Sequence, residues 1–218
     1  MAPARPRRIR IHVVHESRML AEAISVKLKT LLPGSSVDGW TKSWHVYTNR
    51  DQSVADVVIL YNELGNGSPT PAKVSALAPQ GTGIVVLGST TYAPAIRRVL
   101  DAGAHSYVLL TEPTDVIAAA VAAAFRNEEF ISGEVQKLLA DDTAEAVPQL
   151  TLRELEIVSA YLSGSGSSVP ETAAQFGLSA ETVRTHISHA RRKYASGGEP
   201  ITKMELRRRM IHDGWILQ

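Results

Sequence analysis

Two runs of residues decide the fold: Asp56-Val-Val-Ile-Leu60 and Gly83-Ile-Val-Val-Leu-Gly88. Neither run alternates apolar with polar residues, as a strand with one face in water would. Nearly continuous apolar runs of this length, rich in β-branched residues, are typical of parallel strands that are buried on both faces. The two runs therefore predict a parallel sheet that helices cover on both sides.

Strand-like and helix-like segments alternate around these runs, over residues 9–125. The stretch from 37 to 54 has no clean period, so we expect one strand and a shortened helix there. Alternation with short links implies a parallel α/β sandwich, and five units in about 120 residues fit a flavodoxin-like five-stranded sheet. Its ligand crevice lies at the carboxyl ends of the strands, and the loop at 65–71 would lie over it. Further strands are expected at 10–14 and 106–110, and helices at 17–32, 92–102 and 114–125.

The chain changes character after this α/β part. The stretch from 127 to 149 is acidic and rich in small residues, and we expect one helix over 134–139 followed by a flexible tether. We therefore divide the chain into an α/β domain at 8–126, a linker at 127–148 and an all-α domain at 149–218.

Local signals place helices after residue 150. Thr151 and Glu154 have the spacing of a capping box. Pro170 is expected to open a short helix, and Ser179 to cap a longer one. A last helix is expected over 202–212. A short helix, a tight turn and a longer helix form the helix-turn-helix arrangement.

The longer helix has an apolar back and a polar front. Its apolar residues recur at steps of three and four, at Val183, Ile187, Ala190 and Tyr194. The remaining positions project toward solvent, as they do on a recognition helix in the DNA major groove. We expect the early ones to meet base edges and the later basic ones to meet phosphates. The DNA-contacting side chains expected on this face are Thr182, Arg184, Thr185, Ser188, His189, Arg191, Arg192 and Lys193.

Basic residues gather in the same part of the chain. The whole chain has a net charge of +1, but residues 181–209 contain eight Lys or Arg and three acids. A local excess of this kind indicates an anionic partner such as nucleic acid. A solvated helical surface is the alternative interpretation.

The C-terminal motifs resemble the LuxR-type DNA-binding domain over about 65 residues. They are Leu150-Thr-Leu-Arg-Glu-Leu-Glu156, Glu171-Thr-Ala-Ala174, Leu178-Ser-Ala-Glu-Thr-Val-Arg-Thr-His186 and Arg191-Arg-Lys193. Two features depart from the family pattern: the loop at 164–168 is longer, and Glu171-Thr172 replaces an acid followed by isoleucine. The resemblance implies base reading by Arg184, Thr185 and Ser188, and a dimer contact through the last helix.

An α/β domain followed by a LuxR-type domain resembles the NarL/FixJ class of response regulators. That resemblance implies a receiver whose aspartate, at the end of the third strand, accepts a phosphoryl group with bound Mg²⁺. Here the aspartate position falls on Tyr61, beside Asn62, and only Glu16 and Glu63 remain as carboxylates for a cation. The family's acidic pair falls on His15 and Glu16, its hydroxyl on Gly88 or Ser89, and its lysine on Leu110 or Thr111. We therefore expect a pseudo-receiver that aspartyl phosphorylation does not switch.

Two interpretations of this degenerate pocket stay open. His15, Tyr61, Asn62 and their neighbours could hydrogen-bond a small-molecule effector, or they are ordinary strand-end residues in a domain that dimerises or docks a partner. Tyr107 falls on the family's aromatic switch position, and its switching role is doubtful without a hydroxyl residue at Gly88.

Several functional classes are excluded by composition. The chain of 218 residues has no cysteine, so disulfides, thiolate metal sites and cysteine nucleophiles are excluded. No apolar run is long enough to span a bilayer, and the N-terminus is too polar for a signal peptide. His186 and His189 have no third ligand nearby in the sequence. We expect a cytoplasmic protein with no metal, no cofactor and no membrane partner.

These observations favour a transcription regulator that binds double-stranded DNA as a homodimer and is not an enzyme. A sigma-factor-like subunit, which binds promoters only together with RNA polymerase, is one alternative. A flavodoxin-like ligand-binding protein or enzyme is another, but the segment after the first strand lacks a phosphate-binding glycine loop.

Overall fold

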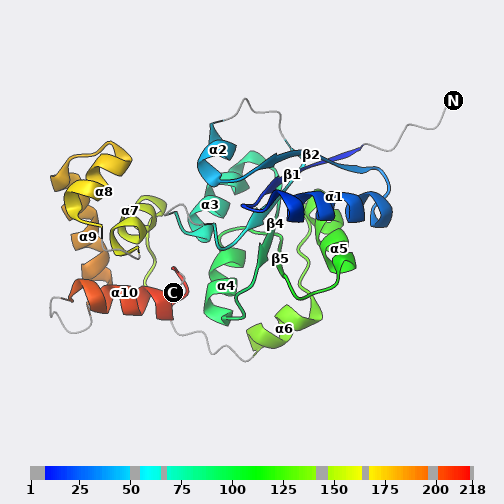
Figure 1. Ribbon diagram of the computed structural model, residues 1–218. Coiled ribbons are helices and arrows are strands. Elements are labelled where there is room, and N and C mark those ends of the chain that lie inside the picture. Colours follow the sequence, from blue (N-terminus) through cyan, green and yellow to red (C-terminus); the bar gives the residue numbers. More distant parts are fainter. Residues whose placement is uncertain are drawn as a thin grey trace.

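The computed structural model describes residues 8–49, 55–64, 68–140, 147–163, 167–195 and 201–216. Within them, the first domain contains a five-stranded parallel sheet in the order β2-β1-β3-β4-β5 (Figure 1). This is the flavodoxin-like arrangement that the sequence predicts. The strands are β1 (Ile9–Val14), β2 (Ser35–Thr41), β3 (Val57–Tyr61), β4 (Gly83–Gly88) and β5 (Ser106–Leu109).

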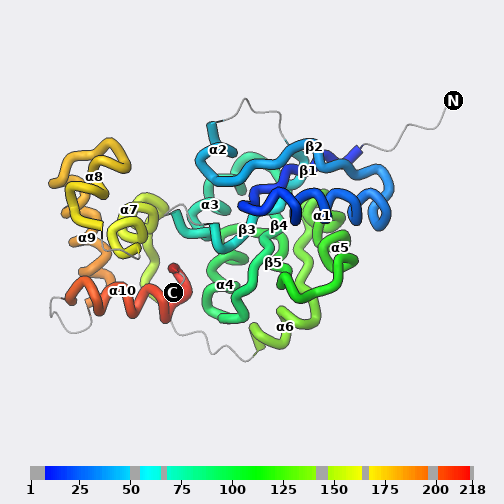
Figure 2. Tube along the Cα trace, in the orientation of Figure 1, coloured from blue at the N-terminus to red at the C-terminus, as the bar shows by residue number. Residues whose placement is uncertain are grey.

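Helices cover both faces of the sheet (Figure 2). Helices α1 (Arg18–Leu31) and α5 (Thr114–Phe125) pack on one face. Helices α3 (Thr70–Leu77) and α4 (Ala93–Asp101) pack on the other. The five-residue α2 (Trp44–Thr48) is the shortened helix expected after the second strand, and the 3₁₀ helix η1 (Ala78–Gln80) follows α3.

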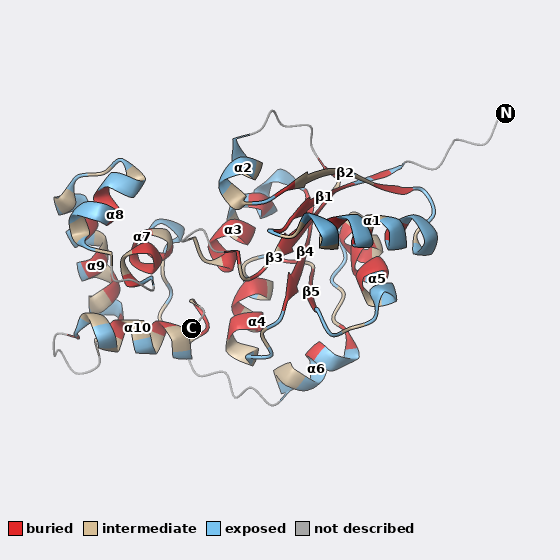
Figure 3. Ribbon diagram, in the orientation of Figure 1, coloured by how far each residue is buried: buried red, intermediate tan, exposed pale blue. Residues whose placement is uncertain are grey.

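The strand β3 is buried on both of its faces. Val57 and Ile59 pack in the core under α1 and α5, whereas Val58 and Leu60 pack in the core under α3 and α4. Figure 3 accordingly draws β4 and β5 as buried, whereas the edge strand β2 is only partly buried. The prediction from the two apolar runs is confirmed.

Helix α3 was not among the predicted helices. It is buried on nearly every side, against the sheet and against the second domain, so its residues show no polar face. The loop predicted at 65–71 is correspondingly shorter, because α3 begins at Thr70. Residues 65–67 of that loop lie outside the described residues.

Helix α6 (Gly133–Ala140) confirms the helix expected in the predicted linker. Its Val135 is fully buried in the same core as α3 and α4. The tether expected after it falls largely on 141–146, outside the described residues. The boundaries at 126, 127–148 and 149 stay a prediction.

The second domain is helical. It contains α7 (Leu152–Leu162), α8 (Val169–Phe176), α9 (Ala180–Tyr194) and α10 (Lys203–His212). The capping box of Thr151 and Glu154 is present. A second box joins Ser168 to Glu171, so α8 begins at Val169 and Pro170 takes the second helical position rather than the first. Of the loop expected at 164–168, residues 164–166 lie outside the described part of the chain.

The two domains touch at two places. Ala72 of α3 packs into the core of the second domain, where α3 contacts α7. The segment after α10 lies against α4: Arg98 donates a hydrogen bond to the carbonyl of Asp213, 3.1 Å away, and its guanidinium lies 5.1 Å from the centre of the Trp215 ring. Helices α8 and α9 lie on the side of the second domain away from the sheet (Figure 1).

Candidate DNA-binding surface and receiver-like pocket

The turn before α9 orients this helix on the rest of its domain. Gly177 ends α8 in the left-handed conformation, with φ of 62°, a backbone that favours glycine. Ser179 then caps α9 by accepting a hydrogen bond from the backbone N–H of Thr182. Helix α9 buries one stripe, which consists of Val183, Ile187, Ala190 and Tyr194 as predicted.

The opposite face of α9 presents the residues that the sequence assigned to DNA contact. Its exposed residues are Thr182, Arg184, Thr185, Ser188, Arg192 and Lys193, while His189 and Arg191 are half-buried. Their common placement on one surface was predicted; contact with DNA stays a prediction. We call this set the α9 surface.

Arg184 is held only loosely. Its guanidinium lies 3.2 Å from the carboxylate of Glu181, one turn earlier, and both side chains are more than half exposed. An exposed pair of this kind contributes little, about 0–1 kcal/mol. Arg184 can therefore exchange Glu181 for a base edge or a phosphate at small cost.

Lys193 has a partner that sequence reasoning missed. Its ammonium pairs with the carboxylate of Glu154 on α7, whose side chain is 6% exposed. His189 Nδ1 lies 3.8 Å from the same carboxylate, and the backbone N–H of Thr151 donates to it at 2.8 Å. Burial alone would raise the pKa of Glu154, but the hydrogen bonds from Lys193 and Thr151 outweigh it and hold this pKa below its usual value. Glu154 thus joins the start of α7 to the C-terminal half of α9.

The receiver-like pocket lies at the carboxyl ends of β1, β3 and β4. The rings of His15 and Tyr61 stack there, with centroids 4.2 Å apart. Burial lowers the pKa of His15, against the opposing charges of Glu16 and Glu63. Burial and the neighbouring Glu63 raise the pKa of Tyr61, so its hydroxyl stays protonated at neutral pH.

A phenol and an imidazole therefore lie at the position where the resemblance expects an aspartate and an acidic pair. A protonated tyrosine is not a nucleophile for forming an acyl phosphate. Leu110 and Thr111, at the lysine position, are exposed after β5 and carry no positive charge.

Asn62 and Gly88 take part in a packed tyrosine site instead. Tyr107 on β5 is fully buried, and its hydroxyl accepts a hydrogen bond from the side chain of Asn62 and donates one to the carbonyl of Thr90. A Cβ on Gly88 would collide with this hydroxyl. Burial raises the pKa of Tyr107 strongly.

Ser89 and Glu63 form a second connection at this edge. One carboxylate oxygen of Glu63 accepts hydrogen bonds from the backbone and hydroxyl of Ser89, at 2.9 and 3.1 Å, and from the backbone of Thr90 at 3.2 Å. Glu63 thus fixes the loop after β4. Within the described residues, no group of three or more His, Asp, Glu or Cys side chains is arranged to hold a metal ion.

One buried charge was missed by sequence reasoning. Lys73 on α3 is 1% exposed, and its ammonium has no hydrogen-bond partner among the described residues. Burial lowers the pKa of Lys73 to about 8, against the opposing charge of Glu16. No helix was predicted here, so no signal in the sequence marked this lysine as buried.

Comparison with known proteins finds response regulators among the relatives of the chain, although no family model matches it. RamR, a response regulator of Streptomyces coelicolor, is 28% identical over 190 residues, which cover 85% of this chain and 89% of RamR. The response regulator VraR of Staphylococcus saprophyticus is 33% identical over 109 residues. The chain spans about half of the length of VraR, 51%.

None of the described helices is long and apolar enough to cross a membrane.

Solved structures share the two-domain fold. RcsB of Salmonella enterica serovar Typhimurium, bound to the promoter rprA, superimposes with a TM-score of 0.62 at 17% identity. The match covers 93% of this chain and 98% of that RcsB chain. RamR and VraR, the relatives named above, are response regulators, and this chain shares with RcsB a fold in which a five-stranded parallel sheet covered by helices is followed by a helical domain.

Proposed function

We propose that this chain is a transcription regulator that binds a specific site on double-stranded DNA. The α9 surface carries the proposal, because it joins short hydrogen-bonding side chains near the start of the helix to cations near its end. Base edges are read by the former and phosphates are held by the latter in helix-turn-helix proteins. The first domain contacts α7 and the segment after α10, which leaves this surface uncovered in the described structure.

Binding as a homodimer is the second part of the proposal. Helix α10 exposes 84% of Met204, an apolar side chain that a second copy would bury. The resemblance to LuxR-type domains implies a dimer contact through the same helix. RcsB, which shares the fold, has been solved as dimers bound to DNA.

The third part is that aspartyl phosphorylation does not switch the protein. The position of the phosphoryl acceptor holds Tyr61, whose pKa is raised. The buried His15 stacks on Tyr61, and Tyr107 packs against Gly88. Mg²⁺ prefers several oxygen ligands in octahedral geometry. Of the two carboxylates near the pocket, Glu63 already has one of its oxygens engaged by Ser89 and Thr90.

Selection of bound DNA from a random pool by the purified chain tests the first part. Arg184→Ala should weaken binding to the selected site by roughly tenfold to a hundredfold, as expected for loss of a bidentate base contact, and should change binding to random DNA much less. Arg18→Ala is the matched control, because Arg18 is exposed on α1, far from α9 in the sequence and in the other domain. Equal losses on both kinds of DNA would show that Arg184 contacts phosphate only.

The same sample separates the alternative of a sigma-factor-like subunit. A regulator of the proposed kind retains the selected DNA by itself, whereas a sigma-like subunit retains it only when RNA polymerase is added.

Incubation with acetyl phosphate and Mg²⁺, followed by intact mass measurement, tests the third part of the proposal, that aspartyl phosphorylation does not switch the protein. We expect no phosphoryl adduct, and an adduct at a carboxylate would refute it.

A further inference from the structure

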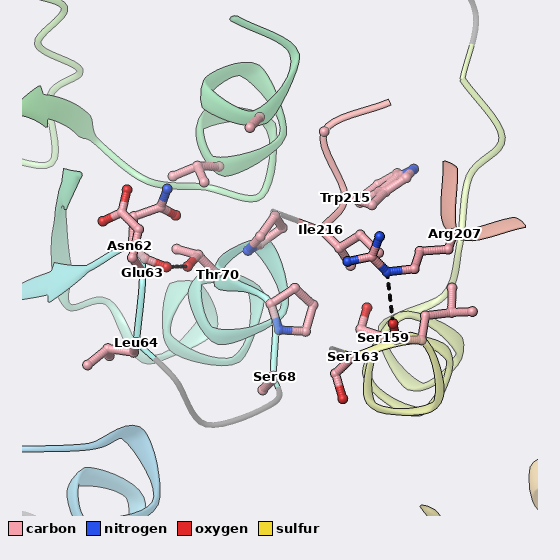
Figure 4. A pocket seen from close by; sticks show the side chains of 16 residues that line it. Asn62, Glu63, Leu64, Ser68, Thr70, Ser159, Ser163, Arg207, Trp215 and Ile216 are labelled. Carbon is pink, nitrogen blue, oxygen red and sulfur yellow. Dashed lines mark hydrogen bonds between the residues drawn. The ribbon is translucent and has the colours of Figure 1, made fainter. Parts of the chain in front are cut away.

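A cavity of about 330 Å³ lies between the two domains (Figure 4). Its walls come from the segment after β3, the start of α3 and α4 on one side, and from α7, α10 and the last described residues on the other. This volume is at the lower end of the range for small-molecule sites, about 300–1,000 Å³. The cavity adjoins the receiver-like pocket, because Asn62 and Glu63 line it, but His15 and Tyr61 do not.

Tight contacts between the domains form the rim of the cavity. Gly214, with φ of 76°, leaves no room for a Cβ, which would overlap the backbone of Pro94 and Ala95. The hydroxyl of Tyr92 donates to the carbonyl of His212, and Arg98 donates to that of Asp213. The cavity therefore exists only while these two segments stay together.

The cavity has apolar walls and polar side chains at both ends. Leu64, Val99 and Trp215 supply much of the apolar lining, together with prolines at the start of α3. Figure 4 shows Ser159 and Arg207 together on the side of the second domain, across from Asn62 and Glu63. A molecule that fills the cavity is therefore mainly apolar, and Ser159 and Arg207 are the polar side chains that α7 and α10 offer it.

Ser159 indicates what that polar group is. Its side chain is 4% exposed, and its hydroxyl has no hydrogen-bond partner among the described residues. A buried hydroxyl without a partner costs about 1–3 kcal/mol, so it stands to gain from a polar atom in the cavity. Arg207 lies beside it, and among the described residues its guanidinium donates one hydrogen bond, from Nε to the carbonyl of Leu162 at 3.2 Å. A guanidinium and a hydroxyl in one corner match a carboxylate.

We propose that this interdomain cavity binds a small apolar carboxylic acid, with an aromatic or branched body between Leu64, Val99 and Trp215 and its carboxylate on Arg207 and Ser159. Such a ligand contacts both domains at once, so it favours the arrangement in which the end of α10 is held on α4. Glu63 at the opposite end disfavours a second negative charge. The proposal does not depend on DNA binding.

The proposed site is tested by adding benzoate, phenylacetate or indole-3-acetate to the full chain. Ligand-observed NMR and thermal unfolding measure the binding of each acid. We expect saturable binding of at least one of these acids and binding about tenfold weaker for its neutral amide, because the amide loses the charge-assisted contact. Arg207→Gln and Ser159→Val should each weaken the acid about tenfold or more. Arg208→Gln is the matched control, since Arg208 is the next residue on α10, is 77% exposed and does not line the cavity.

Gly214→Ala supplies an independent test of the interdomain position. Its added Cβ separates α4 from the last segment, so it should abolish binding of the acid while each domain keeps its helical and sheet content by circular dichroism. The proposal is overturned if all three acids fail to bind at millimolar concentration, or if they bind Arg207→Gln or Gly214→Ala as well as the unaltered chain. DNA binding is measured separately, so failure here leaves the proposed function standing, and the reverse also holds.

Discussion

The ring of Tyr107 occupies the space that a side chain on Gly88 would need, since its Cζ atom lies 2.7 Å from the position of a Cβ on that glycine. The resemblance to receivers places a hydroxyl residue at Gly88 and a switching aromatic residue at Tyr107. In this chain the two positions have become one packed unit. Asn62 and Thr90 bind the tyrosine hydroxyl inside the domain. The aromatic residue is thereby fixed within the core.

Gly88→Ala should therefore destabilise the first domain. The new methyl group meets the tyrosine ring in a closely packed interior, for which overpacking typically costs about 1–3 kcal/mol. Urea unfolding measures the loss. Gly133→Ala is the control, because a Cβ there meets open space and should change the free energy of unfolding by no more than about 0.5 kcal/mol.

Making the same Gly88→Ala substitution in a Tyr107→Leu variant tests whether the ring of Tyr107 causes that loss of stability. In Tyr107→Leu the ring is gone, so adding Gly88→Ala should cost clearly less than it does in the unaltered chain. Strictly additive losses would mean that Tyr107 is not what excludes a side chain at Gly88.

Lys73→Met should stabilise the protein at neutral pH. The pKa of Lys73 is lowered to about 8 from 10.5, chiefly by burial, so keeping its charge inside the fold costs up to about 3 kcal/mol below pH 8. Methionine has a similar length and no charge. We expect the free energy of unfolding at pH 7 to rise by about 1–3 kcal/mol in urea titrations.

The effect of Lys73 on the free energy of unfolding should also depend on pH, with a definite sign. Between pH 8 and 10.5 the unfolded chain binds the lysine proton and the folded chain does not, so this contribution to stability rises with pH in that window. Lys73→Met should lack that rise, whereas Lys27→Met, at an exposed lysine of α1, should keep it. If both variants follow the unaltered chain from pH 7 to 10.5, the ammonium of Lys73 is not buried as a charge.

Glu154→Gln should destabilise the second domain. The buried carboxylate is bonded to Lys193 and to the backbone of Thr151, and hydrogen bonds to charged groups contribute about 1.5–3 kcal/mol. Thermal unfolding of the variant at pH 7 measures the loss. Glu156→Gln, on the same helix with its carboxylate in a more exposed pair with Arg153, should cost less.

The stabilisation by the carboxylate of Glu154 should depend on pH in the acid range. Its pKa in the folded chain lies below the ordinary value of 4.5, so its contribution is fully present above pH 4.5 and is lost as the pH falls through the lowered pKa. The difference in stability between the unaltered chain and Glu154→Gln should therefore shrink as the pH falls toward 3. A difference that stays constant down to that pH would contradict the assignment.

The parts of this structure that sequence could predict are those set by local rules. The apolar run of β3 requires cover on both faces, and the spacing of Thr151 and Glu154 makes a capping box without help from the rest of the chain. The stripe of α9 likewise follows from its period. Local rules could not predict the burial of Lys73 or the ion pair of Lys193 with Glu154. Burial of Lys73 depends on how α3 sits between the sheet and α7, and Lys193 finds Glu154 across 39 residues of chain.

Arg192 and Lys193 should differ in their effect on DNA binding, although both were assigned to phosphates. Each phosphate contact that is lost reduces the slope of log affinity against log salt by about 1. Arg192→Gln should show this reduction with little change in stability, because Arg192 is exposed. Lys193→Gln removes a partner of the buried Glu154, so it should lower the stability of the second domain and reduce the salt slope by less, because Lys193 must leave Glu154 to reach a phosphate. Salt titrations of binding to the selected DNA, together with thermal unfolding, measure both. If the two variants give equal slopes and equal stability, the pair between Lys193 and Glu154 does not restrain the lysine in solution.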